Sequence, residues 1–184
     1  DGHWAGFTPE GFEKEIANIN AMPADQLKEL IESGEYVPSY MWNQNGWLCS
    51  KMKLHVTSQT QKCYPTTHTE DLFSQTLNAT IKAGDPTGMR AVVTTETEEG
   101  ITLVTECVGK VFAPDEFDRN DWTFIGEPET TVSVNKPATV EMTCATIVNR
   151  IPQLIDAPAG YVTTDKYPYN EYCVHALNSY VNSK

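Results

Sequence analysis

The stretch MRAVVTTETEEGITLVTECVGKVF, residues 89–112, decides the fold class. Both of its halves are rich in β-branched residues and alternate between apolar and polar side chains, which is the pattern of β-strands. Glu98-Glu99-Gly100 separates the two halves and predicts a hairpin turn. Residues 101–112 carry apolar side chains on both faces, so we expect a central strand that is covered on both sides.

Strand-like segments also precede and follow this hairpin. Each of them combines β-branched residues with a period of two. These segments are Leu54–Gln61, Leu77–Ala83 and Thr130–Lys136. The polar stretches between the strands predict turns and loops. They are PTTHTED at 65–71, GDPTG at 84–88 and APDEFDRNDW at 113–122.

The first 52 residues show the helical period instead. Thr8-Pro9-Glu10 is a typical helix start, with a hydroxyl cap, proline at the first helical position and an acid in the first turn. A second helix is expected to begin at Pro23 and to end at Gly34. Ser39–Met52 predicts a third helix, which Gly46 weakens.

One long helix is expected after the strands. Its apolar residues recur at helical spacing. They are Cys144, Ile147, Val148, Ile151, Leu154 and Ile155. Pro152 interrupts this pattern, and proline in a helix interior removes an N–H and costs about 3 kcal/mol or more. We therefore expect a kink that leaves the carbonyl group of Val148 without its helical donor, beside the amide of Asn149. The aromatic tail from Tyr167 predicts a short final helix.

Helices first, strands next and a helix after them indicate an α+β fold. We expect a mixed or mostly antiparallel sheet with helices packed on it, an N-terminal helical pair and a kinked C-terminal helix. The chain has 184 residues, which suits a single domain with its own core, so residues 1–184 are taken as one domain.

The composition argues against several classes of partner. With 13 basic and 25 acidic residues the formal charge is −12, so the chain lacks the clustered cations that nucleic acid or an anionic membrane requires. Five cysteines, without a C-x-x-C pair, indicate a reducing compartment and hence the cytoplasm. Cys107 and Cys144 fall on apolar patterns and are expected to be buried.

The chain carries no familiar catalytic motif. It has no G-x-G-x-x-G, no phosphate-binding loop and no nucleophile elbow, and its four histidines match no metal-ligand spacing, so we predict no metal site. His55 lies between Leu54 and Val56 and should point away from them on a strand. Trp42 and Trp47 flank the sequence NQNG; they either pack in the core or form an apolar wall for a small substrate.

A family resemblance narrows these alternatives. ATIVNRIPQLIDAPAGYVTTDKYP, residues 145–168, resembles the closing segment of the 2,4-diaminopentanoate dehydrogenase group. These proteins are relatives of dihydrodipicolinate reductase, and some are native amine dehydrogenases. GFTPEGFEKEI at 6–16 and DWTFIGEPETTVSV at 121–134 resemble two further segments of the same family, in the same order.

The resemblance implies a two-domain oxidoreductase that uses NAD or NADP to interconvert an amine with a carbonyl compound plus ammonia. In such proteins a Rossmann domain binds the cofactor and supplies a catalytic carboxylate. A C-terminal α+β domain covers the nicotinamide, lines the substrate pocket and pairs subunits into a homodimer. The chain resembles only this second domain, so we expect a fragment of a longer polypeptide, with no catalytic residue of its own.

The resemblance also implies roles for particular residues. Asn149 and the carbonyl group of Val148 would orient either the carboxamide of the nicotinamide or the substrate amine. Trp42, Trp47 and Met89 would wall the substrate pocket. Where diaminopentanoate-acting members have an Arg-His pair, this chain has Thr94 and Thr95, which favours a smaller or more apolar amine, ketone or aldehyde.

Two other interpretations remain open. The chain could be a non-enzymatic module that binds a small molecule or assembles through its sheet, which would explain the lack of catalytic motifs. A secreted, disulfide-bonded domain would require pairing among the five cysteines.

Overall fold

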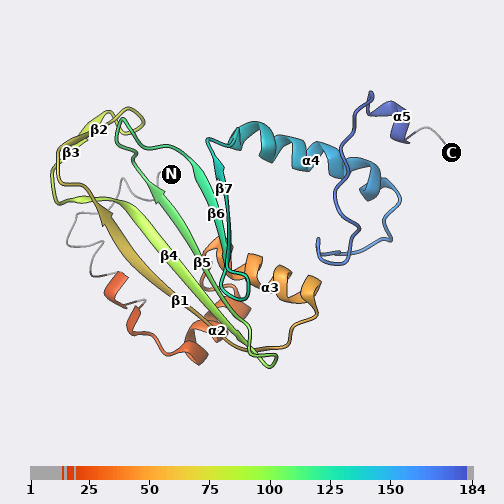
Figure 1. Cartoon of the computed structure of the whole chain (residues 1–184), viewed down its shortest axis with the longest axis horizontal. Coiled ribbons are helices and arrows are strands. Elements are labelled where there is room, and N and C mark those ends of the chain that lie inside the picture. Colours follow the sequence, from red (N-terminus) through yellow and green to blue (C-terminus); the bar gives the residue numbers. More distant parts are fainter. Residues whose placement is uncertain (1–13, 15, 19, 182–184) are drawn as a thin grey trace. The chain divides into compact units, whose positions relative to one another are not determined.

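The computed structural model describes residue 14, residues 16–18 and residues 20–181 (Figure 1). The chain divides into two compact units, Asp1–Ala113 and Pro114–Lys184, and each is described by itself. The fold class is α+β with antiparallel sheets, as predicted. The predicted role of residues 1–184, as one domain that binds substrate and forms a dimer, stays a prediction.

The helices of the first unit follow their sequence signals. Residues 14, 16–18, 20 and 21 are helical, whereas the predicted start at Thr8 lies outside the described residues. Helix α2, Ala24–Ser33, ends at Gly34, whose φ of 80° is the left-handed conformation that glycine adopts without strain. Helix α3, Tyr40–Met52, begins where the Ser39 hydroxyl accepts a hydrogen bond from the N–H of Met41, and Gly46 does not end it.

Three antiparallel strands form the main sheet of this unit, in the order β1-β4-β5. Their bounds are β1 Val56–Thr67, β4 Pro86–Thr97 and β5 Thr102–Lys110. A second, two-stranded sheet pairs β2, Leu72–Ser74, with β3, Ala79–Ile81. The predicted strands are confirmed with shifted ends. Parts of the predicted turns and loops at 65–71 and 84–88 belong to β1 and β4 instead.

The predicted centre of the sheet is wrong. Strand β5 lies at the edge, and β4 is the central strand, hydrogen-bonded on both sides. Apolar side chains on both faces of β5 suggested a covered strand, yet Val104 is 64% exposed and Val108 is 42% exposed. The side chains of β4 alternate toward one buried face, which contains Ala91, Val93, Thr95 and Thr97.

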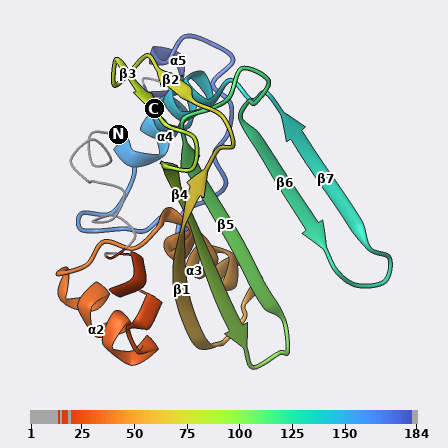
Figure 2. The ribbon, with the colours of Figure 1, turned by 90° about the vertical axis from the view of Figure 1, so that its left-hand side faces the viewer.

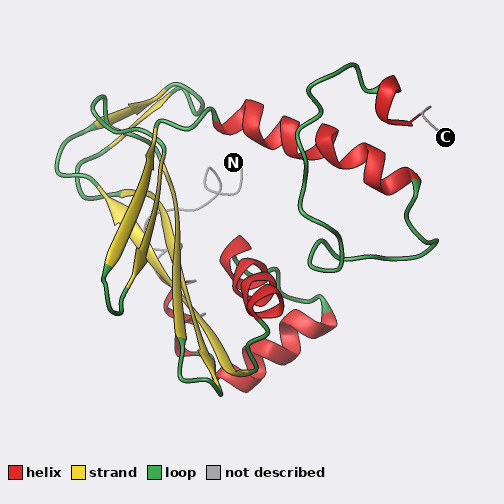
Figure 3. Cartoon of the chain, turned by 45° about the vertical axis from the view of Figure 1, so that its right-hand side comes forward, coloured by secondary structure: helices red, strands yellow, loops and turns green. Residues whose placement is uncertain are grey.

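One face of this sheet is covered by helices and the other is open. Helix α3 lies beside the sheet (Figures 2 and 3), and its Asn45 side chain reaches Thr95 in β4. The small core on this face contains Ile16, Cys63 and Ala91, with Met89 packed against it. The opposite face keeps Val104 and Val108 exposed, so the described part of this unit buries one sheet face only.

The cysteine prediction was wrong in part. Cys144 is exposed and Cys107 is half-buried, whereas Cys49 and Cys63 are buried instead. Cys144 lies on helix α4, in which the described residues of the second unit bury no side chain, so its apolar neighbours in sequence did not bring it into a core. All five cysteines are free thiols.

The second unit contains a hairpin, a long helix and a tail. Strands β6, Arg119–Phe124, and β7, Thr130–Asn135, pair antiparallel, so part of the predicted loop at 113–122 is a strand. Helix α4, Thr139–Ile155, includes Pro152 and has no buried residue. The predicted final helix is confirmed as α5, Asn178–Val181. Among the described helices, none has both the length and the apolar character that crossing a bilayer requires.

Candidate functional site

The residues that the sequence singled out lie in both units. Trp42, Trp47 and Met89 belong to the first unit, together with Thr94 and Thr95 in β4. Val148 and Asn149 are consecutive residues of α4 in the second unit. Each group is therefore examined within its own unit.

The two threonines of β4 face opposite sides of the sheet. Thr95 is completely buried beneath α3, where its Oγ1 accepts a hydrogen bond of 3.0 Å from Nδ2 of Asn45. Thr94 is half-buried on the open face, in register with Thr60 and Val104. Because side chains alternate along a strand, a pocket on one face can contain only one of these two threonines.

Asn45 is a buried polar residue that sequence reasoning did not single out. It is completely buried, and its Nδ2 also donates to the carbonyl oxygen of Val93 at 3.5 Å. Its Oδ1 is buried without a hydrogen-bond partner in the described part of the chain. Asn45 lies in the NQNG segment between the two tryptophans, so an amide at a core-facing helix position was the available signal.

Trp42 and Trp47 do not share one side of α3. Five helical positions turn the direction of a side chain by about 140°, so the two rings point apart. Both are half-buried, and Nζ of Lys51 lies 5.9 Å from the centre of the Trp47 ring. Met89 packs against the small core. The three residues are distributed around α3 and β4, and both interpretations of the tryptophans, core packing and pocket wall, stay open.

Glutamine and asparagine side chains tie the helices to β1. Gln61 accepts from the N–H of Ser39 at 2.8 Å and donates to the hydroxyl of Tyr36 at 3.0 Å. Asn20 accepts from the N–H of Cys63 at 2.8 Å and donates to the Cys63 carbonyl at 2.7 Å. These bonds satisfy polar groups on the covered face of the sheet, so they help to hold the N-terminal helical segment against β1.

In the second unit, Asn149 and Val148 lie beside Pro152. Because proline has no N–H, the carbonyl group of Val148 lacks the hydrogen bond that a helix interior normally supplies. Val148 is 45% exposed and Asn149 is half-buried. The Oδ1 atom of Asn149 accepts a hydrogen bond of 3.0 Å from the backbone N–H of Cys173. Asn149 is thus neither sealed in a core nor fully exposed.

The chain from 167 to 173, called here the tail segment, crosses one stripe of α4. Asn170 donates to the carbonyl oxygen of Thr146 at 2.9 Å, and Gln153 donates to that of Tyr169 at 3.0 Å. Arg150 donates to the carbonyl oxygen of Pro168 at 2.9 Å and to the side chain of Gln153. Residues 146, 149, 150 and 153 share one helix face, which explains why one extended segment reaches all four.

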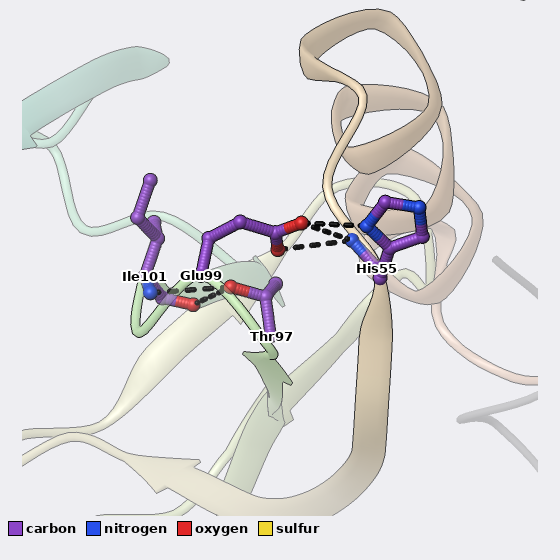
Figure 4. A network of polar contacts seen from close by, with 4 residues as sticks. All are labelled: His55, Thr97, Glu99 and Ile101. Carbon is purple, nitrogen blue, oxygen red and sulfur yellow. Dashed lines mark hydrogen bonds and ion pairs between the residues drawn. The ribbon is translucent and has the colours of Figure 1, made fainter.

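His55 forms a short charged contact with Glu99 in the first unit (Figure 4). Its Nδ1 lies 2.6 Å from Oε1 of Glu99, and its backbone N–H donates to Oε2 of Glu99 at 3.0 Å. The hydrogen bond to Glu99 raises the pKa of His55 above 6.5, and the same contact lowers the pKa of Glu99 to about 2. His55 precedes β1 rather than lying on a strand, and it is exposed.

The described residues offer no group of three or more His, Cys, Asp or Glu side chains that could hold a metal ion. Burial raises the pKa of the Cys63 thiol, and burial likewise raises that of Cys49 and Cys107. These thiols are therefore protonated at neutral pH, which does not suit a nucleophile. The chemistry that the described residues support is hydrogen bonding and positioning.

Comparison with known proteins supports the predicted resemblance. No protein-family model matches the chain, and no curated protein matches it. The chain is similar to the solved structure of the amine dehydrogenase from Mycobacterium smegmatis, with 32% sequence identity and a TM-score of 0.69. The match covers 86% of this chain and 47% of that one, so the chain spans about half the length of that protein. A likeness to amine dehydrogenases is therefore confirmed, whereas the narrower 2,4-diaminopentanoate branch stays a prediction.

Proposed function

We propose that this chain is the substrate-binding and dimerisation half of an NAD(P)-dependent amine dehydrogenase of the 2,4-diaminopentanoate dehydrogenase group. The enzyme would interconvert a small amine with a ketone or aldehyde plus ammonia. The observation that carries this proposal is the 32% identity to an amine dehydrogenase over 86% of the chain. Because that match uses only 47% of the relative, the remaining length leaves room for a domain that holds the cofactor.

NAD or NADP, when bound, supplies or accepts the hydride of this reaction. A domain outside this chain would hold most of the cofactor and would provide the carboxylate for proton transfer. The residues of this chain fit one end of the cofactor, because Val148 offers a carbonyl group without a helical donor and the neighbouring Asn149 offers an amide. The contribution of this chain would be positioning, which places the reacting carbon within reach of the nicotinamide ring.

The substrate would be small and without a negatively charged end. By the family resemblance, Thr94 and Thr95 would stand where diaminopentanoate-acting members have a cationic pair that could receive a carboxylate. Since they face opposite sides of β4, one of them at most would touch the substrate. Trp42, Trp47 and Met89 would supply apolar surface. We also assign the enzyme to the cytoplasm, in line with its five free cysteines.

The open face of the β1-β4-β5 sheet supports a homodimer. Val104 and Val108 are exposed on it, together with Tyr64 at 37% exposure. Arg90, in the central strand, lies 3.6 Å from Glu106 and 4.9 Å from the Tyr64 ring centre. An apolar surface with interspersed charges on a sheet is a suitable interface for a second copy, because a two-fold axis brings each patch against the same patch of the partner.

Two measurements on the complete polypeptide test the enzyme proposal. We expect quenching of NADH or NADPH fluorescence on binding, and ammonia-dependent oxidation of the reduced cofactor in the presence of small ketones or aldehydes. A panel of such substrates would then define the specificity. If the polypeptide neither binds a reduced cofactor nor reduces any carbonyl compound, the dehydrogenase assignment is wrong.

The alternative is a non-enzymatic module that binds a small molecule or assembles through its sheet. The exposed valines of the open face favour it, because they serve assembly without any catalytic domain. It would be supported if the polypeptide dimerises through that face while both cofactor experiments fail.

A further inference from the structure

We propose that the open face of the β1-β4-β5 sheet binds a second copy of this chain with the two β4 strands antiparallel, so that Arg90 of each copy pairs with Glu96 of the other. The two-fold axis then runs across β4 at the position of Val93. This inference rests on the proposed function, which includes a homodimer. It deepens that proposal by giving the direction of the partner and the residues that select it.

The central strand carries an ordered charge pattern on the open face. Because side chains alternate along a strand, the residues of β4 on that face are Arg90, Val92, Thr94 and Glu96. The two charged residues are exposed, and the two uncharged ones between them are half-buried. Reversing the strand about its midpoint at Val93 exchanges the cation with the anion. Two antiparallel copies of β4 therefore bring opposite charges together at both ends.

Within one copy these two charges cannot meet. Arg90 and Glu96 lie about 20 Å apart, because a strand rises about 3.3 Å per residue. Glu96 accepts a hydrogen bond of 2.6 Å from the hydroxyl of Thr102, which is a neutral partner. The Arg90 side chain lies 3.6 Å from Glu106 and stays 44% exposed, and a guanidinium group has five N–H donors. Both residues can therefore take a charged partner from a second copy.

The other two-fold arrangement places like charges together. If the axis ran along β4 instead of across it, Arg90 would face Arg90 of the partner and Glu96 would face Glu96. Only the outer strands favour that arrangement, because it brings Lys62 of β1 over Glu106 of β5. The central strand lies on the axis in both arrangements, whereas the angle of about 30° between packed sheets displaces the outer strands. The charges of β4 therefore decide, and they favour the antiparallel copy.

The residues around the charged pair supply the apolar part of the interface. Val92 lies between the two charged ends of β4, and the proposed axis places it against Thr94 of the partner. Val104 and Val108 of β5 are exposed on the same face. Specific interfaces combine an apolar centre, which is buried on association, with charged groups that set the register. The open face has both features.

Charge exchange in the complete polypeptide tests the inference, with the Kd of the dimer measured by sedimentation equilibrium. Glu96→Arg turns both Arg–Glu contacts into Arg–Arg contacts, so the Kd should rise about 100-fold or more. Arg90→Glu should have the same effect. The double variant Arg90→Glu/Glu96→Arg exchanges the two charges and should return the Kd to within about tenfold of that of the unaltered protein. Residues that only support the fold of one copy would not give this rescue.

A second set of variants covers the case in which Arg90→Glu does not fold, since Arg90 also contacts Glu106 and the Tyr64 ring within one copy. Glu96→Gln keeps an oxygen for the Thr102 hydroxyl but removes the charge, so it should weaken the dimer about tenfold. Thr102→Val removes the same hydrogen bond and keeps the charge, so it should leave the Kd unchanged within about threefold. Equal losses in these two variants would overturn the inference.

Lys62→Glu is the matched control, because it reverses a charge on the same face but on an outer strand. The proposed axis keeps β1 over β1 and β5 over β5, so Lys62 does not meet Glu106 of the partner and the Kd should change less than about tenfold. If Lys62→Glu weakens the dimer, Lys62→Glu/Glu106→Lys restores it and Glu96→Arg is harmless, the copies are parallel and the inference is wrong.

The remaining outcomes separate this inference from the proposed function. A polypeptide that oxidises the reduced cofactor but is monomeric, or that stays dimeric in Glu96→Arg, overturns the inference and leaves the dehydrogenase standing. A polypeptide that binds no cofactor but follows the charge exchange supports the inference and overturns the dehydrogenase. In a monomer, the open face would be covered by another part of the polypeptide, which would show as slow hydrogen exchange along β4.

Discussion

The carboxylate of Glu99 contacts both the imidazole ring and the backbone N–H of His55. Nδ1 of His55 lies 2.6 Å from Oε1, and the His55 N–H donates to Oε2 at 3.0 Å (Figure 4). The contact joins the residues before β1 to the turn between β4 and β5. In the same turn the Thr97 hydroxyl donates to the Ile101 carbonyl at 2.8 Å and accepts from the Ile101 N–H at 3.1 Å.

This pair predicts a pH-dependent contribution to stability. The pKa of Glu99 is lowered from 4.5 to about 2, so its contribution is present above pH 4.5 and is lost as the pH falls toward 2. The pKa of His55 is raised from 6.5, so its contribution is complete below pH 6.5 and is lost as the pH rises through the higher folded value. The charged contact should therefore stabilise most between about pH 4.5 and 6.5.

The measurement compares the unfolding midpoint of the unaltered chain with that of Glu99→Gln across pH. The difference should be largest inside this window and smaller on both sides, and the NMR titration of His55 should move to lower pH in the variant. Glu98→Gln is the control, because Glu98 acts on His55 only through its charge at a distance. A difference that does not vary with pH would contradict the charged contact.

Valine substitutions at Thr95 and Thr94 test the buried hydrogen bond between Asn45 and Thr95. Thr95→Val removes the acceptor of the 3.0 Å hydrogen bond from Asn45, and the buried amide then keeps only the longer bond to the Val93 carbonyl. We expect a loss of about 1–3 kcal/mol in the free energy of unfolding, measured in urea. Thr94→Val changes a half-buried residue on the open face and should stay within about 0.5 kcal/mol. Equal effects would refute the assignment of the two side chains to opposite faces.

Alanine substitutions at Gly88 and Gly46 should have opposite effects on stability. A Cβ atom at Gly88 would lie 2.1 Å from the Gly109 carbonyl oxygen and 2.4 Å from Cα of Lys110, both backbone atoms of the neighbouring strand. Gly88→Ala should therefore destabilise by about 1–3 kcal/mol or more. At Gly46, inside α3, nothing lies within 4 Å, so Gly46→Ala should stabilise by about 0.5–1 kcal/mol through helix propensity. Thermal unfolding of the two variants checks the signs, and a tolerated Gly88→Ala would contradict the β4–β5 register.

If the open face of the β1-β4-β5 sheet forms the homodimer, a positive charge placed on that face should prevent dimerisation. Val104→Lys, at a position that is 64% exposed on that face, should convert the proposed homodimer to a monomer, because each copy would bury an unpaired cation. Val37→Lys is the control, since Val37 is 85% exposed in the connection between α2 and α3. Light scattering after size-exclusion chromatography reports the mass. A dimer that survives Val104→Lys would place the interface elsewhere.

Local signals in the sequence predicted most of the elements. Ser39 and Gly34 act through bonds and torsions within a few residues, so the bounds of α2 and α3 follow from their neighbours. The same alternation along 89–97 puts Thr94 and Thr95 on opposite faces of β4, although the family resemblance had placed both in the substrate pocket. The hairpin turn at Glu98-Glu99-Gly100 needed no distant partner either. Each of these features depends on backbone geometry over one turn of chain.

The sequence by itself therefore determined the α+β class, the hairpin at 98–100 and the missing donor at Pro152. Only the tertiary structure decided which strand is central, because residues 101–112 carry apolar side chains on both faces whether or not anything covers them. It also decided that Asn45 meets Thr95, that His55 meets Glu99, and that Cys173 turns the amide of Asn149. These pairs are separated by 24–50 positions in the chain, and a hydrogen bond acts over about 3 Å, so only the folded path of the backbone could bring the partners together.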